Sequence, residues 1–246
     1  MPFVIALQFL TTLPVKLREE IRPGQFANSL VTFPIVGALI GLFLYGMYLL
    51  SDLLFNGPIS AGIVLVMLLL VTGALHLDGL MDTCDGLLCS GKSLDERLKI
   101  LKDSRVGSFG VVGGLSIMLL KLLAIMALPQ ELRLAGLVLM PTLGRWAQVY
   151  AIVSHPYARS GGLGDLFRAQ VKWRHFISAT AIALAIVVGL AEFRGLMAMA
   201  IALLAAWLVA RFAVSRIAGL TGDVYGAINE VVEVAVLLAL PVLPRL

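Results

Sequence analysis

Charged residues are scarce in this sequence. Only 14% of its 246 residues are Asp, Glu, Lys or Arg, and 60% are hydrophobic, whereas soluble domains usually carry about 25% charged residues. The formal net charge is only +4 and the basic residues form no block, which argues against nucleic acid as a partner. The composition therefore favours a polytopic membrane protein over a soluble one.

Cysteine is also rare, since only Cys84 and Cys89 are present. Their spacing is neither that of a CxxC motif nor that of a disulfide framework, so both are expected to be free, reduced thiols with a structural role. The N-terminal stretch MPFVIALQFLTTLPV lacks a basic segment and a small-residue cleavage site. It is therefore not expected to be a removable signal peptide.

Long apolar runs are what the sequence does contain. A membrane-spanning helix needs about 20 mostly apolar residues, so the short segment from Phe3 to Leu13 is expected to form an interfacial or re-entrant helix instead. The sequence predicts an all-α integral membrane helix bundle with a single domain over residues 1–246. About seven transmembrane helices are expected, at 26–50, 59–77, 107–128, 132–153, 175–192, 195–215 and 231–244.

Lys and Arg are unevenly distributed between the two ends of these spans. If the spans alternate in direction, 14 of the 19 basic residues fall on the side of the N-terminal segment and only three on the other. Because cytoplasmic loops retain positive charge, this side is expected to face the cytoplasm. It also carries the polar loops at about 78–106, 154–174 and 216–230, so the active site is expected there.

The stretch HLDGLMDTCDG, residues 76–86, follows the second predicted span. Its acids Asp78, Asp82 and Asp85 are spaced i, i+4 and i+7, so a helix places them on one stripe within about 60° of each other. Like charges so close need water or a cation between them, and Mg²⁺ prefers oxygen ligands. A Mg²⁺ site is therefore predicted, with a plain solvated helix face as the alternative. His76 would lie on the opposite side in a structural role.

The segment KDSRVGSFG opens the third predicted span with residues that suit a phosphate group. Lys102 and Arg105 supply cations and Ser104 supplies a hydroxyl, and two glycines let backbone N–H groups approach an anion at a helix start. Asp103 would add a carboxylate to the metal site. Phosphate binding is therefore predicted, and the alternative is ordinary cytoplasmic positive charge followed by a helix cap.

Two later segments contain further candidates. In HPYARSGGLGD, Arg159 with Gly162 and Gly164 would hold a second anionic group, unless the segment is a plain flexible loop. In GLTGDVYGAINEVVE, Asp223 is predicted to join the site, and Glu230 follows in an otherwise apolar helix.

Two basic residues, Lys121 and Arg145, lie within or near predicted spans. A charge at that depth is costly. Both are therefore expected to face a polar interior, and the alternatives are pairing with a buried acid or extension to the interface.

The order and the amino-acid sequences of these blocks resemble those of the cobalamin synthase family, the adenosylcobinamide-GDP ribazoletransferases. The matching blocks span nearly the whole chain in family order, so the resemblance is more specific than any single motif. They are LQFLTTLPV at 7–15, TFPIVGALIG at 32–41, TGALHLDGLMDTCDGL at 72–87, LKDSRVGSFG at 101–110, YARSGGLG at 157–164 and GLTGDVYGA at 219–227.

The resemblance implies a Mg²⁺-dependent transfer at the inner membrane. Adenosylcobinamide-GDP and α-ribazole, or its 5′-phosphate, would give adenosylcobalamin, or its 5′-phosphate, and GMP. A ribose hydroxyl would attack the phosphorus attached to the cobinamide, and catalysis would come from positioning and charge stabilisation. A homo-oligomer, or an assembly with other late cobalamin-pathway enzymes, would be compatible with this role.

This activity suggests roles for the candidate residues. Asp78, Asp82 and Asp85 would bind Mg²⁺, with Asp82 also counted as catalytic. Asp103 or Asp223 would complete the metal shell or orient the nucleophile. The expected substrate-binding residues are Lys102, Ser104, Arg105, Arg159, Gly162 and Gly164.

Two other enzyme families and one transporter class are alternatives. DTCDG resembles the D-x-x-D-G start of CDP-alcohol phosphotransferases, but Cys89 and Ser90 stand where that family has Ala-Arg. A UbiA-type prenyltransferase would show a second Asp-rich motif, for which Asp223 and Glu230 are a poor substitute. A divalent-cation transporter would place its acids at mid-span, whereas the acids here cluster at span ends.

Overall fold

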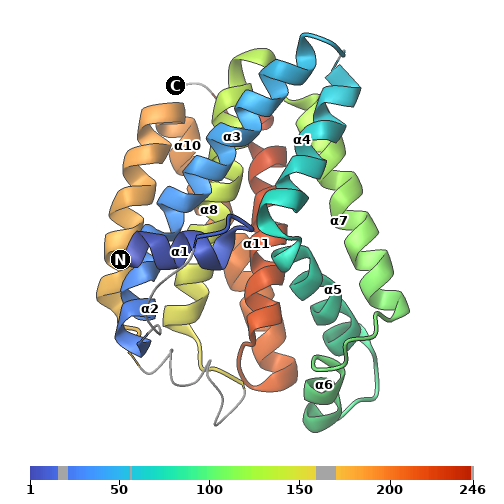
Figure 1. Ribbon diagram of the computed structural model, residues 1–246. Coiled ribbons are helices and arrows are strands. Elements are labelled where there is room, and N and C mark those ends of the chain that lie inside the picture. Colours follow the sequence, from blue (N-terminus) through green and yellow to red (C-terminus); the bar gives the residue numbers. More distant parts are fainter. Residues whose placement is uncertain (16–21, 56, 159–169, 245–246) are drawn as a thin grey trace.

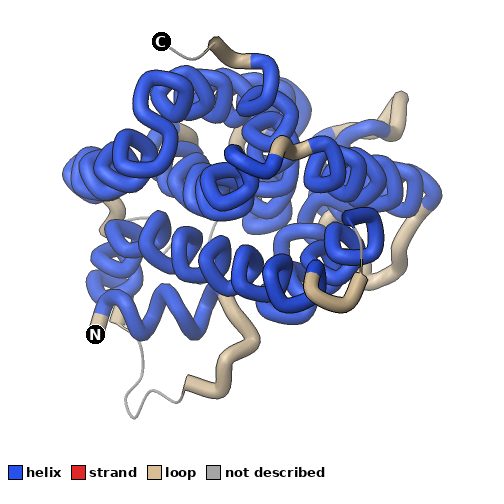
Figure 2. Tube along the Cα trace, turned by 90° about the horizontal axis from the view of Figure 1, so that it is seen from above, coloured by secondary structure: helices blue, strands red, loops and turns tan. Residues whose placement is uncertain are grey.

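The computed structural model describes residues 1–15, 22–55, 57–158 and 170–244. Within these ranges all regular elements are helices (Figures 1 and 2), which confirms the predicted all-α class. The α-helices are α1 (Pro2–Leu10), α2 (Pro23–Ser29), α3 (Phe33–Asp52), α4 (Gly57–Thr72), α5 (Leu75–Leu88), α6 (Leu94–Ile100), α7 (Ser108–Ala127), α8 (Arg133–Ser154), α10 (Trp173–Ile217) and α11 (Gly222–Val242). The 3-10 helices η1 (Leu30–Thr32) and η2 (Gln130–Leu132) precede α3 and α8.

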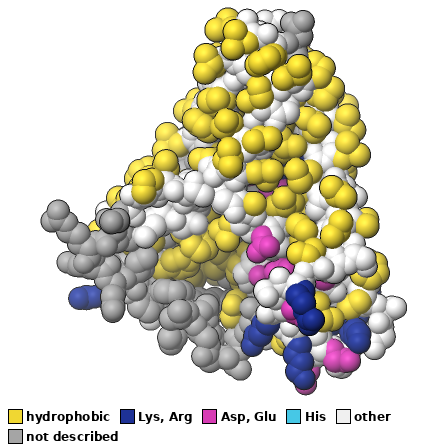
Figure 3. All heavy atoms as spheres, turned by 45° about the vertical axis from the view of Figure 1, so that its right-hand side comes forward, with side chains coloured by type: hydrophobic (Ala, Val, Ile, Leu, Met, Phe, Trp, Pro, Cys, Tyr) yellow, Lys and Arg dark blue, Asp and Glu magenta, His cyan; other side chains and the backbone are white. Residues whose placement is uncertain are grey.

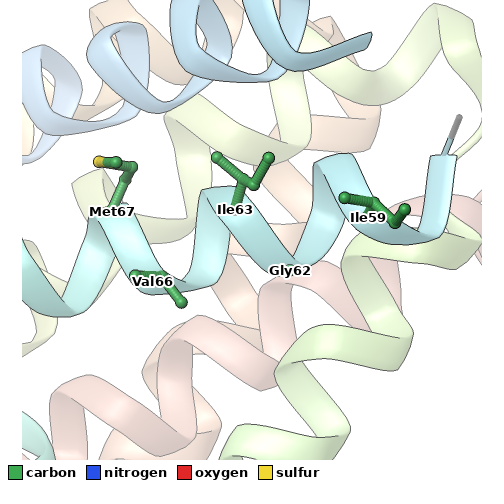
Figure 4. A pocket seen from close by; sticks show the side chains of 5 residues that line it. All are labelled: Ile59, Gly62, Ile63, Val66 and Met67. Atoms are coloured by element: carbon green, nitrogen blue, oxygen red, sulfur yellow. The ribbon is translucent and has the colours of Figure 1, made fainter. Parts of the chain in front are cut away.

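The outer surface of the bundle is strongly apolar. Hydrophobic side chains predominate over the upper part of the face drawn in Figure 3, and Leu115 and Leu70 are 64% and 60% exposed. Such extensive apolar exposure is typical of a surface that contacts lipid. A shallow hollow on α4 belongs to this surface (Figure 4). It is lined by Ile59, Gly62, Ile63, Val66 and Met67.

Among the described residues, four helices are long and apolar enough to cross a membrane, or five if the bent pair α4 and α5 counts as one span. This agrees with a polytopic membrane protein but gives fewer such helices than the seven predicted. One reason is that α8 carries Arg145 and Gln148, which lower its hydropathy although most of the helix is buried. Another is that α10 counts once, although its backbone is non-helical at Glu192, where the sequence predicts a turn.

The predicted span over 59–77 is broken, because the chain bends by 88° between α4 and α5, which pass as a membrane span only when taken together. Gly73 and Ala74 both have left-handed backbone conformations, with φ of 60° and 54°. Two consecutive residues of this kind cannot continue a right-handed helix. The bend separates the apolar α4 from the Asp-rich α5 and gives the two helices different directions.

The N-terminal segment satisfies the backbone at this bend. The Thr12 N–H donates to the Val71 carbonyl at 2.8 Å, and the Thr12 hydroxyl donates to the Leu70 carbonyl at 2.9 Å. A helix end inside a membrane protein needs such internal partners. α1 lies just before Thr12 and runs across the direction of the long helices (Figure 1), as expected for a short interfacial or re-entrant helix.

Ala74→Gly is expected to stabilise the protein. A left-handed conformation costs a non-glycine residue about 1–2 kcal/mol, and glycine removes this cost while adding freedom to the unfolded chain. We expect a net gain of about 0.5–1 kcal/mol, seen as a higher midpoint of thermal unfolding in detergent. Ala181→Gly is the matched control, because Ala181 is helical and exposed in α10, and it should lower the midpoint. A lower midpoint for Ala74→Gly would contradict the prediction.

The last helix begins earlier than the predicted span at 231–244, because α11 starts at Gly222. Thr221 caps it, with its hydroxyl oxygen accepting a hydrogen bond from the Val224 N–H at 3.4 Å. Polar residues in the first half of α11 hide its helical character from a search for apolar runs. Glu230 is nevertheless only 6% exposed, so this half of α11 also lies inside the bundle.

α8 packs against α3 on one side and against α10 and α11 on the other. Glycines bring α3 close to α8: a Cβ on Gly41 would lie 2.5 Å from the Cα of Val138. Small residues allow helices in membranes to approach closely. The close packing against α3 fixes the position of α8, which also packs against α11.

Candidate active site

Polar segments that are far apart in the sequence meet at one end of the bundle. The end of α5, the start of α7, the end of α8 and the start of α11 all lie at the lower end in Figure 1. Charged side chains gather at the lower end of the face drawn in Figure 3. The described parts of the three predicted site loops therefore adjoin one another.

The three acids of α5 lie away from its buried face. α5 is helical at all three positions, as predicted. Asp78 is exposed and Asp82 and Asp85 are half-buried, whereas Leu80 is buried. His76 is 3% exposed on the core side, in agreement with the structural role expected for it.

Asp85 caps the start of α7. The backbone N–H groups of Gly107 and Gly110 donate to its two carboxylate oxygens at 2.7 and 2.8 Å. The sequence suggested that these glycines admit a phosphate, but the anion that lies there is the carboxylate of Asp85. Carboxylates at a helix N-terminus are stabilised by the free N–H groups and the helix dipole. Asp85 therefore ties α5 to the loop that carries Asp103.

Asp85→Asn is expected to destabilise the protein by about 1–2 kcal/mol. The amide nitrogen would face one of the two N–H donors, and the favourable charge at the helix start would be lost. The check is thermal unfolding in detergent without Mg²⁺, so that metal binding plays no part. Asp95→Asn, an exposed acid of α6, is the control and should change little. Equal stability of the two variants would argue against the capping role.

α5 and α11 cross at two glycines. A Cβ on Gly79 would lie 2.8 Å from the Asp223 carbonyl oxygen, and a Cβ on Gly226 would lie 2.9 Å from the His76 carbonyl oxygen. Larger side chains would push these helices apart. The crossing therefore places the backbone of Asp223 against Gly79, which lies between Asp78 and Asp82 in the sequence of α5. The Thr221 hydroxyl donates to Asp223 Oδ2 at 3.1 Å.

Asp103 and Arg105 form a pair in the loop between α6 and α7. Nε and Nη2 of Arg105 donate to the carboxylate at 3.1 and 2.8 Å, and the Arg105 backbone N–H donates at 3.1 Å. The side-chain bonds, followed by the backbone bond, lower the pKa of the Asp103 carboxyl, which makes it a weaker base. Lys102 and Ser104 are exposed in the same loop. The structure thus places the predicted phosphate-binding group at the surface of the polar end.

The segment that leads into the third predicted loop lies beside the start of α11. The Ala158 N–H donates to the Leu220 carbonyl at 2.8 Å, and the Leu220 N–H donates to the Pro156 carbonyl at 2.9 Å. These bonds form a short parallel bridge three residues before Asp223. The predicted residues Arg159, Gly162 and Gly164 lie outside the described residues.

Four charged side chains pair inside the bundle. Lys121 Nζ of α7 donates to Glu230 at 2.6 Å and to Glu233 at 2.5 Å, and Arg145 of α8 pairs with Glu233. The side chains are at most 8% exposed. Of the alternatives for Lys121 and Arg145, pairing with buried acids is the one that the structure shows.

Two uncharged side chains extend this network. Nη2 of Arg145 lies 3.3 Å from His76 Nδ1, and the Asn229 amide donates to Glu233 at 3.0 Å. Neither Glu233 nor Asn229 was predicted from the sequence as a partner of these cations. A charge count would have found Glu233, because two cations in apolar helices call for two acids, and α11 offers Glu230 and Glu233 one turn apart.

The comparisons with known proteins match one family over nearly the whole chain. The family model for cobalamin-5-phosphate synthase matches residues 2–241. An adenosylcobinamide-GDP ribazoletransferase of Pseudomonas savastanoi pv. phaseolicola is 38% identical, over 99% of this chain and 100% of the relative. Proteins of the same name from Desulforamulus reducens and a Roseiflexus species are 38% and 37% identical, over 93% and 97% of this chain and 91% and 88% of the relatives. No solved structure matches.

These matches do not favour the phosphotransferase, prenyltransferase or transporter alternatives. The family match includes α5, α7 and the start of α11, which meet at the polar end of the bundle, and also α1. The resemblance read from the sequence is therefore confirmed over the segments that build the polar end of the bundle. The chain belongs to the cobalamin-5-phosphate synthase family.

Proposed function

We propose that this chain joins adenosylcobinamide-GDP to α-ribazole, or to its 5′-phosphate, and releases GMP. The observation that carries the proposal is the family match over residues 2–241, with relatives named for this transfer along nearly their full length. The meeting of the α5 acids, Asp223 and the loop before α7 at one end of the bundle supports placing the reaction there.

Mg²⁺ suits the donor groups at this end. Among the described residues, no three His, Cys, Asp or Glu side chains are already arranged around a common metal position. Mg²⁺ commonly binds through one or two carboxylates, with waters and substrate phosphates as its other ligands. Asp78 and Asp82, one turn apart on the accessible side of α5, would supply such carboxylates. Asp85 follows one turn later on α5, where its carboxylate oxygens accept from Gly107 and Gly110. When bound there, Mg²⁺ would neutralise the charge of the pyrophosphate.

The proposed reaction needs a group that accepts a proton. The ribose hydroxyl oxygen forms a bond to the phosphorus attached to the cobinamide, the bond from that phosphorus to GMP breaks, and the hydroxyl proton passes to a base. Asp223 suits this role better than Asp103, because Arg105 lowers the pKa of Asp103. Asp103 would instead hold Arg105 in place. Lys102 and the Arg105 N–H groups that do not contact Asp103 would bind phosphate oxygens, with the Ser104 hydroxyl beside them.

The proposed location is the inner membrane, with the polar end toward the cytoplasm. The support is the excess of Lys and Arg at that end and the cytoplasmic origin of a GDP-activated substrate. Labelling of Ser104→Cys in a Cys84→Ala, Cys89→Ala background of intact cells tests this. A membrane-impermeant thiol reagent should label it only after the inner membrane is opened, and labelling of intact spheroplasts would reverse the orientation.

The activity is tested with purified protein in liposomes, adenosylcobinamide-GDP, α-ribazole 5′-phosphate and Mg²⁺. GMP and the new corrinoid should appear together in equal amounts, and EDTA should stop both. Binding of Mn²⁺, followed by electron paramagnetic resonance, tests the metal site without turnover. Folded protein that forms no product would disprove the proposed activity.

A further inference from the structure

The buried network of His76, Lys121, Arg145, Glu230 and Glu233 lies close behind the candidate active site. His76 precedes Asp78 by two residues on α5, and Glu230 follows Asp223 by seven residues on α11. At the crossing of α5 and α11, Gly226 lies against the His76 carbonyl and Gly79 lies against the Asp223 carbonyl, so residues of the network and of the acid group both belong to this contact. Any change in the network would therefore act on the helices that carry the acids.

The network is a poor source of stability in itself. Burying charges costs so much desolvation that an apolar replacement of both partners is often neutral or stabilising. The four charges balance, since Lys121 and Arg145 face Glu230 and Glu233. What such a network can supply instead is a defined arrangement of the helices that carry its members, because each pair broken inside the bundle would leave a buried charge without its partner.

His76 is the only described member on α5, and its hydrogen bonding is directional. Arginine can only donate, so the Nδ1 of His76 accepts from Arg145 and a neutral ring carries its proton on Nε2. That Nε2 is buried and has no hydrogen-bond partner among the described residues. The contact with Arg145, at 3.3 Å, is therefore what joins α5 to the network of α7, α8 and α11.

We propose that this network positions the active-site acids: it sets the α5–α11 crossing so that Asp78 and Asp82 face Asp223. His76 is the positioning residue on α5, and Arg145 and Glu233 hold it. This inference rests on the proposed function, because its consequence is measured on that reaction. A purely structural network would contribute to folding but not to the geometry of the acids.

His76→Leu separates these two roles. It releases α5 from the network and leaves all four charges paired. The unpartnered Nε2 of His76 is removed, but Arg145 Nη2 loses its acceptor, so the protein should fold with an unfolding midpoint only modestly below that of the parent protein. Turnover should fall at least about tenfold, because displacements of about 1 Å at an active site cost up to about 100-fold in rate. The KM values for both substrates should change less than about twofold, since the exposed phosphate-binding loop is untouched.

Thr83→Val is the matched control for His76→Leu. Thr83 is also buried on α5, and its hydroxyl has no hydrogen-bond partner among the described residues. This isosteric change removes a buried polar atom from the same helix without touching the network. It should leave kcat, KM and the unfolding midpoint unchanged.

A distance measurement tests the proposal without turnover. Spin labels at Leu88→Cys on α5 and Leu238→Cys on α11, both exposed, report the crossing in a Cys84→Ala, Cys89→Ala background. The distance distribution should shift or broaden with His76→Leu and stay unchanged with Thr83→Val. If His76→Leu fails to fold, His76→Phe, which keeps a ring but cannot accept a hydrogen bond from Arg145, is measured instead and should behave as His76→Leu is expected to.

Full activity in the folded variant, or lost activity with an unchanged distance distribution, would overturn the positioning role. Failure of the proposed function looks different, because the parent protein would then make no product while the distance measurement would still respond to His76→Leu.

Discussion

Asp82→Asn should abolish turnover, with a loss on the order of 10²- to 10³-fold or more, while expression and folding stay normal. Asp82 lies in the middle of the acid stripe, is half-buried, and occupies the turn of α5 that follows Gly79, where α11 brings Asp223 alongside. An amide of the same shape keeps the packing but lacks the negative charge that would hold Mg²⁺. Turnover is measured as GMP release in liposomes.

The control for Asp82→Asn is Asp95→Asn, which removes an exposed carboxylate from α6 at the same end of the bundle. It should retain full turnover. Mn²⁺ binding should weaken in the Asp82 variant and not in the control. Retained turnover in Asp82→Asn would remove this residue from the catalytic group and leave Asp78 as the main metal ligand of α5.

Lys121→Met should destabilise the protein by about 3–5 kcal/mol. It removes the shared partner of Glu230 and Glu233 and leaves Arg145 as the only cation facing two buried carboxylates. The expected result is a sharp fall in the yield of monodisperse protein in detergent and in the unfolding midpoint. Adding Glu230→Gln removes the surplus charge and should recover most of both.

The matched control is Lys92→Met. Lys92 pairs with Glu96 at 3.5 Å, but both side chains are more than 40% exposed. Exposed pairs of this kind contribute about 0–1 kcal/mol, so the variant should be close to the parent protein. A similar stability of Lys121→Met and Lys92→Met would show that the buried network is not needed for folding.

Much of the fold could be predicted from hydropathy, because long apolar runs have few alternatives in a membrane. The errors arose where local backbone chemistry overrides that pattern. Gly73 is visible in the sequence, but nothing there shows that Ala74 adopts a left-handed conformation that ends α4. The early start of α11 was missed because Glu230 is polar, and only its partner on another helix explains its burial.

The candidate site could be predicted in its members but not in their contacts. The i, i+4, i+7 spacing placed the α5 acids along one accessible side, and the positive charge identified the shared end of the bundle. That Asp85 binds the start of α7 depends on the packing of α5 against α7, which the spacing does not contain. The approach of Asp223 likewise depends on Gly79 and Gly226, whose role only the helix crossing reveals.

The contact of Thr12 with Leu70 and Val71 has a consequence for how the protein is made. The ribosome synthesises Thr12 about 60 residues before the carbonyls that it caps. Those carbonyls would otherwise lose their hydrogen bonds as α4 enters the membrane. This cap can therefore form only after residues 70 and 71 have been made and have met Thr12, which couples the N-terminal segment to the completion of the α4–α5 bend.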